Sequence, residues 1–162
     1  MSDRAATLHI ANPERTCAIA QALAPRLRPG DVILLDGQIG AGKSHFARCL
    51  ILASLDQPED VPSPTYTLVQ SYPGRHGEIW HADLYRLGDI SEIEELGLIQ
   101  AFSAAICLVE WPARLGDLAP PGALHLSLET PAETPAQDDT RIMHLTWSDP
   151  AWDKKLEDLT DD

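Results

Sequence analysis

Two runs of consecutive apolar residues stand out in the hydrophobic pattern of the chain. Residues 32–35 read Val-Ile-Leu-Leu, and residues 105–110 contain Ile-Cys-Leu-Val before a terminal glutamate. Apolar runs without polar alternation are typical of strands that are covered on both faces, as in a parallel sheet. We therefore expect both segments to be central strands of an α/β fold.

Helical periodicity flanks the first of these strands. Before it, Asn12 can cap a helix that begins at Pro13 and that Pro25 ends or kinks, with Ile19 and Leu23 on its inner face. After it, apolar residues recur at the spacing i, i+3, i+4 and i+7, as in a helix that lies on a sheet. These residues are Phe46, Cys49, Leu50 and Ala53. The predicted order is helix, buried strand, helix.

Alternating apolar and polar residues predict further strands. Residues 67–72 and 78–85 flank a Pro-Gly turn signal and predict a hairpin, whereas 124–128 and 143–147 predict an antiparallel pair across an acidic loop. A short strand is also expected at 7–11. The pattern thus combines a parallel core with antiparallel strands in one mixed sheet.

A further helix carries a capping signal. Ser91 and Glu94 have the spacing of a capping box, and Gly97 suits the end of this short helix. The charged C-terminal segment is expected to fray at 160–162. With 162 residues, 44% of them hydrophobic, the chain is long enough for one compact domain over 1–162.

Charge argues against two classes of partner. The chain has 12 Lys and Arg against 25 Asp and Glu, which is a formal net charge of −13. Such an excess repels nucleic-acid phosphates and anionic membrane surfaces, and no apolar run approaches the length of a membrane span. We therefore expect no direct nucleic-acid reading and no membrane association, and the cysteines described next favour a cytoplasmic location.

The cysteines and two of the histidines are expected to be structural. Cys17, Cys49 and Cys107 are odd in number and have no C-x-x-C spacing, which favours reduced thiols over a disulfide framework. All three are expected to pack as small buried hydrophobic side chains. For His45 and His81 we expect a structural role, because no other ligand has a spacing that suits a metal cluster.

A phosphate-binding loop is the most specific motif. Residues 37–44 read Gly-Gln-Ile-Gly-Ala-Gly-Lys-Ser and match the pattern G-x-x-x-x-G-K-[ST], between an apolar strand and an amphipathic helix. Backbone N–H groups can wrap a polyphosphate closely only where side chains are small. The small residues here are Gly37, Gly40, Ala41 and Gly42. We therefore expect a nucleotide site.

Lys43 and Ser44 supply the two side chains that this motif needs. Lys43 is the only lysine in the first 153 residues. Its ammonium would contact the β- and γ-phosphates, which makes it a candidate catalytic as well as binding residue, and the Ser44 hydroxyl would ligate Mg²⁺. The lone lysine is thus explained by the loop.

A carboxylate at the end of a neighbouring buried strand would complete the metal site. Glu110 ends an apolar run, whereas Asp83 lies on an alternating strand. We assign Glu110 to the metal and Asp83 to the γ-phosphate side, where it would position or deprotonate the attacking water. The same pattern allows the two roles to be exchanged.

Four motifs occur together along the chain. They are 40–44 Gly-Ala-Gly-Lys-Ser, 63–67 Ser-Pro-Thr-Tyr-Thr, 81–87 His-Ala-Asp-Leu-Tyr-Arg-Leu and 109–112 Val-Glu-Trp-Pro. Their order and spacing resemble the TsaE (YjeE) family, the small bacterial ATPases required for the threonylcarbamoyladenosine modification of tRNA. The resemblance spans residues 7–128.

The resemblance implies a P-loop NTPase-type fold of three layers around a mixed sheet, with a site for ATP and Mg²⁺. It implies action with a TsaD–TsaB pair that modifies the adenosine next to the anticodon, with ATP hydrolysis resetting that complex. Turnover by the chain alone is expected to be weak, and its contact with tRNA indirect.

Residue roles carry over where the motifs match. Ser44 and Glu110 correspond to Mg²⁺ ligands, Asp83 to an essential acidic residue near the γ-phosphate, Thr65 to part of a switch-like loop, and Trp111 to a nucleotide-responsive tryptophan. The resemblance therefore implies the same metal ligands as the strand pattern.

Two positions match the family less closely. Where the family often has a second hydroxyl residue after the P-loop serine, this chain has His45, which still supplies a backbone N–H to the nucleotide. The family also tends to have a threonine near the nucleotide base in its first helix, and Thr16 is a weak match. Both are included among the candidate nucleotide-binding residues.

Two other functions compete with this interpretation. A signalling GTPase would need an N-K-x-D segment, and Asn12 is the only asparagine of the chain. A small-molecule P-loop kinase shares the same phosphate loop and is the alternative that motifs do not exclude. Its arginine-bearing lid has no clustered counterpart in the sequence.

Overall fold

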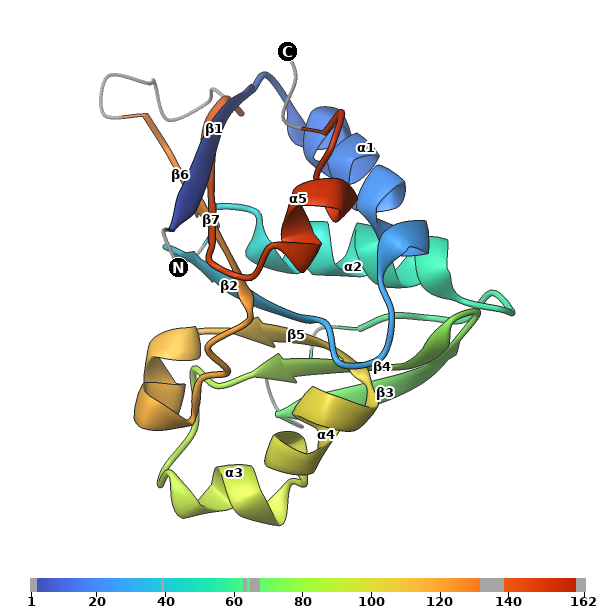
Figure 1. The fold of residues 1–162 in the computed structure, drawn as a ribbon, viewed down its shortest axis with the longest axis vertical. Coiled ribbons are helices and arrows are strands. Elements are labelled where there is room, and N and C mark those ends of the chain that lie inside the picture. Colours follow the sequence, from blue (N-terminus) through green and yellow to red (C-terminus); the bar gives the residue numbers. More distant parts are fainter. Residues whose placement is uncertain (1–2, 39, 63, 65–67, 132–138, 160–162) are drawn as a thin grey trace.

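A single mixed sheet organises the chain. The computed structural model describes residues 3–38, 40–62, 64, 68–131 and 139–159, and within them seven strands form one sheet in the order β1-β7-β6-β2-β5-β4-β3 (Figure 1). The strands are β1 (Arg4–Ile10), β2 (Val32–Gly37), β3 (Val69–Gly74), β4 (Gly77–Asp83), β5 (Ile106–Glu110), β6 (Leu124–Glu129) and β7 (Arg141–Trp147).

Parallel pairing holds the centre of the sheet, and antiparallel pairing holds its edges. β2 pairs in parallel with β5 and β6, and β4 pairs in parallel with β5. The pairs β1–β7, β6–β7 and β3–β4 are antiparallel. The predicted central strands, the hairpin and the antiparallel pair near the C-terminus are therefore confirmed.

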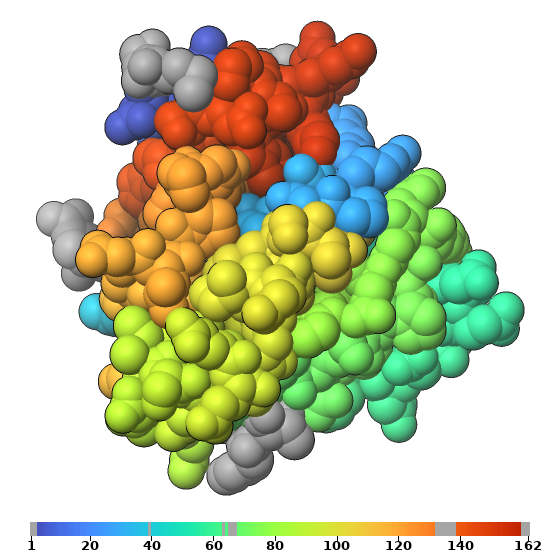
Figure 2. Space-filling view, turned by 60° about the horizontal axis from the view of Figure 1, so that its bottom comes forward, coloured from blue at the N-terminus to red at the C-terminus, as the bar shows by residue number. Residues whose placement is uncertain are grey.

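Helices cover both faces of the sheet and make three layers (Figure 1). On one face lie α1 (Pro13–Leu23), α2 (Lys43–Ser54) and α5 (Ala151–Lys155), and on the other α3 (Ser91–Glu95) and α4 (Leu98–Ala104). Short 3-10 segments occupy Ala24–Arg26 and Pro112–Leu118. In Figure 2 the yellow-green segment that carries α3 and α4 covers much of the sheet face on which these two helices lie. None of the helices in the described ranges has the length and apolar character needed to cross a membrane.

The apolar run of β2 is buried on both of its faces. Ile33 and Leu35 belong to the core beneath α1 and α2, whereas Val32 and Leu34 belong to the core beneath α3 and α4. All four side chains are at most 2% exposed. A strand covered in this way needs apolar residues at every position, which is why its sequence shows no alternation.

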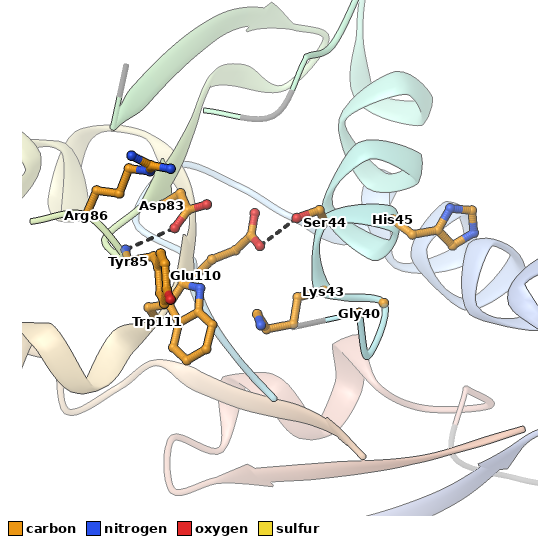
Figure 3. Close-up of a pocket in the computed structure, with 10 residues that line it drawn as sticks. Gly40, Lys43, Ser44, His45, Asp83, Tyr85, Arg86, Glu110 and Trp111 are labelled. Carbon is orange, nitrogen blue, oxygen red and sulfur yellow. Dashed lines mark hydrogen bonds between the residues drawn. The ribbon is translucent and has the colours of Figure 1, made fainter. Parts of the chain in front are cut away.

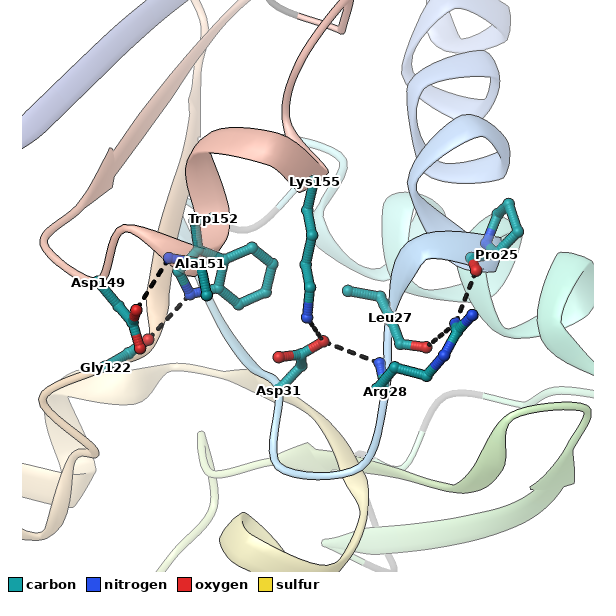
Figure 4. Close-up of polar contacts among 9 residues, drawn as sticks. All are labelled: Pro25, Leu27, Arg28, Asp31, Gly122, Asp149, Ala151, Trp152 and Lys155. Atoms are coloured by element: carbon teal, nitrogen blue, oxygen red, sulfur yellow. Dashed lines mark hydrogen bonds and ion pairs between the residues drawn. The ribbon is translucent and has the colours of Figure 1, made fainter.

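The loop before β2 is tied to α5 by polar contacts (Figure 4). The Asp31 carboxylate accepts hydrogen bonds from the Lys155 ammonium and from the Arg28 backbone N–H, the latter at 2.8 Å. On the same short helix, Trp152 Nε1 donates to the Gly122 carbonyl oxygen at 2.9 Å. These contacts fix the charged C-terminal segment on the sheet.

One predicted helix cap is confirmed and the other is wrong. The Asn12 side chain accepts from the Arg15 backbone N–H at 2.9 Å and caps α1. Ser91 lies inside α3, whose capping residue is Ile90, and no side chain caps that helix. The Ser91 N–H is instead bound by the Asp89 carboxylate at 3.1 Å. The predicted cap is therefore itself a helical residue whose N–H is bound by the preceding turn.

Several strand ends differ from the prediction: the first strand spans Arg4–Ile10 rather than 7–11, for example, and two of the differences have a clear cause. β4 ends at Asp83 rather than residue 85, because the chain turns at 84–87, where the Leu87 N–H donates to the Leu84 carbonyl oxygen. β3 continues through Pro73 to Gly74. A proline is tolerated there because β3 is an edge strand.

The expectation of three reduced cysteines is also wrong. Cys17 of α1 and Cys49 of α2 form a disulfide, and only Cys107 is a buried free thiol. His45, which was expected to lie apart from any metal ligand, is within 4.8 Å of both sulfur atoms through a ring nitrogen. The pairing arises because α1 packs against α2, and sequence spacing gives no sign of that contact.

The burial of α2 predicts a contrast between two leucines on the same helix. Leu50 is fully buried, whereas Leu52 is 46% exposed. We expect Leu50→Ala to lower the free energy of unfolding by about 2–5 kcal/mol and Leu52→Ala to change it by about 0.5 kcal/mol or less. Urea unfolding followed by circular dichroism measures both. Equal losses would contradict the packing described for α2.

Candidate nucleotide-binding site

The phosphate loop connects β2 to α2 at the carboxyl end of the central strand. Gly37 ends β2 at φ +139°, and a Cβ atom there would lie 2.4 Å from the Leu128 carbonyl oxygen of β6. Gly42, at φ +110°, precedes the first residue of α2. Because L side chains rarely adopt these conformations, the two glycines allow the loop to curl tightly against the sheet.

The Lys43 side chain is folded back over its own loop. Its Nζ donates to the carbonyl oxygens of Gly37 (2.6 Å) and Gln38 (3.3 Å), and it lies 4.1 Å from the centroid of the Trp111 ring. The ammonium is therefore held by carbonyl dipoles and by an aromatic face.

Burial and nearby carboxylates act on the pKa of Lys43 in opposite directions. Burial lowers the pKa of the ammonium, and the negative charges of Glu110, Asp36 and Asp83 oppose that shift in part. Among the described residues, Lys43 makes no ion pair with a carboxylate. A polyphosphate would supply the direct countercharge that this buried cation lacks.

A buried hydrogen-bonded chain joins α2 to β5 and β4. The Ser44 hydroxyl donates to Glu110 Oε1 at 2.8 Å, and His81 Nε2 donates to Glu110 Oε2 at 2.6 Å. Glu110 and His81 are each 1% exposed. The other ring nitrogen, Nδ1 of His81, has no hydrogen-bond partner in the described part of the chain. His81 thus holds the carboxylate from behind and turns Oε1 toward Ser44.

This oxygen pair fits Mg²⁺. A hydroxyl and a carboxylate oxygen are ligands of the kind that Mg²⁺ prefers. Two adjacent ligands of an octahedral ion, each at about 2.1 Å from the metal, lie about 3.0 Å apart. The observed 2.8 Å between Ser44 Oγ and Glu110 Oε1 is close to that spacing. The two side chains would therefore hold the ion as neighbouring ligands.

A cavity of about 420 Å³ opens between the phosphate loop and the ends of β4 and β5. Figure 3 shows Lys43 and Ser44 on one side, with Asp83, Tyr85, Arg86 and Trp111 on the other. The lining residues are Gly40, Gly42, Lys43, Ser44, His45, Asp83, Tyr85, Arg86, Glu110 and Trp111. Both carboxylates predicted for the site therefore face the same space as the P-loop lysine.

Asp83 lies beside Glu110 at the end of the neighbouring strand. The two residues are partners in the parallel register of β4 and β5. Asp83 is 5% exposed, and its Oδ1 accepts from the Tyr85 backbone N–H at 3.0 Å. The Tyr85 ring in turn packs on Trp111 with 4.9 Å between centroids. The turn after β4 thus holds the carboxylate in place.

Four predicted binding residues lie outside the cavity lining or outside the described residues. Gly37 contributes its carbonyl to Lys43 from behind the loop, and Ala41 is buried. Thr16 is buried on α1 and does not occur among the residues that line the cavity. Thr65 lies outside the described residues.

His45 contributes to the cavity lining but directs its side chain elsewhere. Its ring points away from the cavity toward α1 (Figure 3), and its Nε2 lies 3.0 Å from the Pro13 carbonyl oxygen. The prediction that His45 offers a backbone N–H to the nucleotide therefore stays compatible with this geometry.

Tyr85 gained no role from sequence reasoning, and His81 was expected to be only structural. The alternation of β4 is the signal that could have placed His81, because residues two apart on a strand share a face. His81 and Asp83 therefore both point toward the α2 side of the sheet, where Glu110 lies.

Comparison with known proteins identifies the family of the chain. The profile of the family described as Threonylcarbamoyl adenosine biosynthesis protein TsaE matches residues 10–141. The chain belongs to the TsaE family. The resemblance seen in the four motifs is confirmed, and at a coarse level membership of the TsaE family implies the role of a nucleotide-binding P-loop ATPase.

Individual TsaE relatives match most of the chain. The tRNA threonylcarbamoyladenosine biosynthesis protein TsaE of Rickettsia bellii is 36% identical over 133 residues, covering 82% of this chain and 89% of the relative. The protein of the same name from Bacillus subtilis is 36% identical over 136 residues, with coverages of 83% and 81%. The crystal structure of YdiB from Bacillus subtilis matches with a TM-score of 0.76 at 27% identity, over 98% of this chain and 96% of that one. The predicted α/β fold is thereby confirmed.

The contact between Lys43 and Trp111 predicts an optical signal for nucleotide binding. A phosphate that draws the ammonium away from the indole changes the electrostatic environment of the ring. We expect ATP to change the tryptophan emission of the chain, and Trp111→Phe to remove most of that change. Trp152→Phe, on α5, is the matched control and should keep it. A full response in Trp111→Phe would contradict the assignment.

Proposed function

We propose that this TsaE-family chain is the ATP-binding and ATP-hydrolysing component of tRNA threonylcarbamoyladenosine biosynthesis. Family membership over residues 10–141 supports the pathway. The observation that carries the ATPase activity is the 2.8 Å contact between Ser44 and Glu110 beside the phosphate loop. A hydroxyl and a carboxylate oxygen at this spacing support the binding of a phosphate-bound Mg²⁺ beside the loop.

The phosphate loop would hold the triphosphate. Backbone N–H groups at the start of α2 would face the phosphate oxygens, with the positive end of the helix dipole behind them. Lys43 would exchange its contacts with the carbonyl oxygens of Gly37 and Gln38 for the β- and γ-phosphates. A Mg²⁺ ion held by Ser44 and Glu110 would neutralise part of the phosphate charge during transfer.

Asp83 is proposed as the residue that acts on the attacking water. It neighbours Glu110 in the sheet register and lines the same cavity as Lys43. A carboxylate in this place can orient the water or accept its proton as it attacks the γ-phosphate. Arg86, in the same lining, is proposed as the cation that counters charge on the transferred group.

The chain is proposed to act with a TsaD–TsaB-type complex in the cytoplasm and to meet tRNA only through it. The net charge of −13 supports indirect contact, because it opposes the counterion-release term that drives nonspecific nucleic-acid binding. We also propose that the partner complex completes or orders the ATP site. The chain would then hydrolyse ATP slowly when it is alone.

The two carboxylates are expected to differ in their effects on Mg²⁺ and on turnover. Glu110→Gln should raise the Mg²⁺ concentration for half-maximal ATP binding by about 10–100-fold, because a metal ligand is weakened. Asp83→Asn should retain Mg²⁺-ATP binding but slow single-turnover hydrolysis by about 10²–10⁴-fold, the usual contribution of a general base. Binding and single-turnover assays across a Mg²⁺ series separate the two effects.

An exposed carboxylate provides the control for these variants. Glu95→Gln, on the solvent side of α3, should change neither quantity. Exchanged phenotypes for Asp83→Asn and Glu110→Gln would reverse the two roles while keeping the site. Wild-type behaviour of both variants would contradict the site itself.

The proposed partners are tested by turnover and by tRNA binding. We expect slow ATP hydrolysis by the chain alone and a rise with purified TsaD–TsaB, which would complete or order the site around ATP. Lys43→Ala should abolish the stimulated rate. Filter binding of labelled tRNA should show no tight complex with the chain alone. Tight, salt-sensitive tRNA binding, or rapid turnover that ignores TsaD–TsaB, would contradict the proposal.

A further inference from the structure

The packing of α1 on α2 brings together three side chains, and of these three residues only His45 also lines the nucleotide cavity. Cys17 comes from α1, and His45 and Cys49 lie one helical turn apart on α2, where residues at i and i+4 share a face. The two sulfur atoms and a ring nitrogen of His45 all lie within 4.8 Å of one another. In the structure the two cysteines form a disulfide, with 5.3 Å between their Cα atoms.

We propose that this cluster is a second metal site, which takes a Zn²⁺ ion when the Cys17–Cys49 disulfide is reduced. Two thiolates and an imidazole form a ligand set that selects zinc and other thiophilic ions over Mg²⁺. The site is therefore distinct in chemistry from the oxygen pair of Ser44 and Glu110.

The spacing of the ligand atoms suits a tetrahedral ion. With Zn–S near 2.3 Å and Zn–N near 2.0–2.1 Å, tetrahedral ligands lie roughly 3.6–3.8 Å apart. His45 Nε2 is already 3.8 Å from Cys49 Sγ. The two sulfur atoms must still separate after their bond is broken, and the His45 ring must leave the Pro13 carbonyl oxygen. Three ligands are then in place, and the fourth position is left for water.

The path to the site is open on the His45 side. His45 is exposed and Cys17 is half-buried, whereas Cys49 is 7% exposed. His45 Nε2 lies 3.0 Å from the Pro13 carbonyl oxygen. To ligate through Nε2 the imidazole gives up that hydrogen bond, and water can take its place at the exposed carbonyl. An ion from solvent can thus reach all three ligands.

The change of state requires a two-electron reductant. A small dithiol breaks the Cys17–Cys49 bond by thiol–disulfide exchange and is itself oxidised to a disulfide, which leaves two cysteine thiols. Binding of Zn²⁺ then releases the two thiol protons, because thiolates are the ligands. The disulfide and the ion are alternatives, and each ties α1 to the first turns of α2.

The third cysteine offers a matched control. Cys107 is fully buried on β5 in the core beneath α3 and α4, and burial raises the pKa of its thiol to about 12. It donates weakly to the Ala101 carbonyl oxygen and is not part of the cluster. Its replacement removes a thiol without touching the proposed ligands.

Cobalt serves as the probe, because Co²⁺ replaces Zn²⁺ and its thiolate complexes absorb in the near ultraviolet. We expect the dithiol-reduced chain to bind one Co²⁺ with thiolate charge-transfer bands, and an equivalent of Zn²⁺ to abolish them. Cys17→Ser should lose the bands, and Cys107→Ser should keep them. His45→Ala should keep the thiolate bands but bind Co²⁺ at least about tenfold to a hundredfold more weakly. The loss of a group that only supports a metal ligand already lowers metal affinity by that factor.

The wild-type chain in its disulfide form is the second control, because it has the full sequence without the two thiolates. It should show no cobalt bands. This comparison does not depend on whether the variants fold. Absence of bands in the reduced wild-type chain, or bands that persist in Cys17→Ser, would overturn the proposal. Binding of ATP with Mg²⁺, measured on the same samples, tests the nucleotide site separately.

Discussion

The parallel pairing of β2, β5 and β4 is the constraint on which the site depends. It aligns Leu35 with Glu110 and Glu110 with Asp83. The three strands therefore end side by side at their carboxyl ends, where the phosphate loop begins. Side chains alternate between the faces of a sheet, so a slip of one residue would turn Glu110 away from Ser44. The apolar run of β5, buried on both faces, pins this register.

The polar groups buried at the carboxyl ends of these strands must form hydrogen bonds with one another. Glu110 and His81 are almost inaccessible to solvent, and polar groups in such places are costly unless they are hydrogen-bonded. His81 and Ser44 together occupy both oxygens of the carboxylate. Lys43 is stabilised in a similar way by carbonyl oxygens and the Trp111 ring. The resting site is thus a compact polar cluster set into two apolar cores.

Local patterns predicted the features that depend on neighbouring residues along the chain. The central strands follow from their apolar runs, and the loop ending in Lys43 follows from its glycines. Contacts between distant elements were not predictable in this way. His81 meets Glu110 only through the register of β4 on β5, and Cys17 meets Cys49 only because α1 packs on α2. The cap expected at Ser91 is wrong because Ser91 itself lies in the first turn of α3, where the Asp89 carboxylate binds its N–H.

The hydrogen bond from His81 to Glu110 has a consequence for ion selectivity. With Oε2 held from behind, Glu110 has a single oxygen, Oε1, to offer a cation. Ca²⁺ commonly takes both oxygens of a carboxylate in a shell of six to eight ligands, whereas Mg²⁺ uses single oxygens in a strict octahedron. Under the proposed assignment, His81 limits Glu110 to one coordinating oxygen. It thereby disfavours Ca²⁺ relative to Mg²⁺ without contacting either ion.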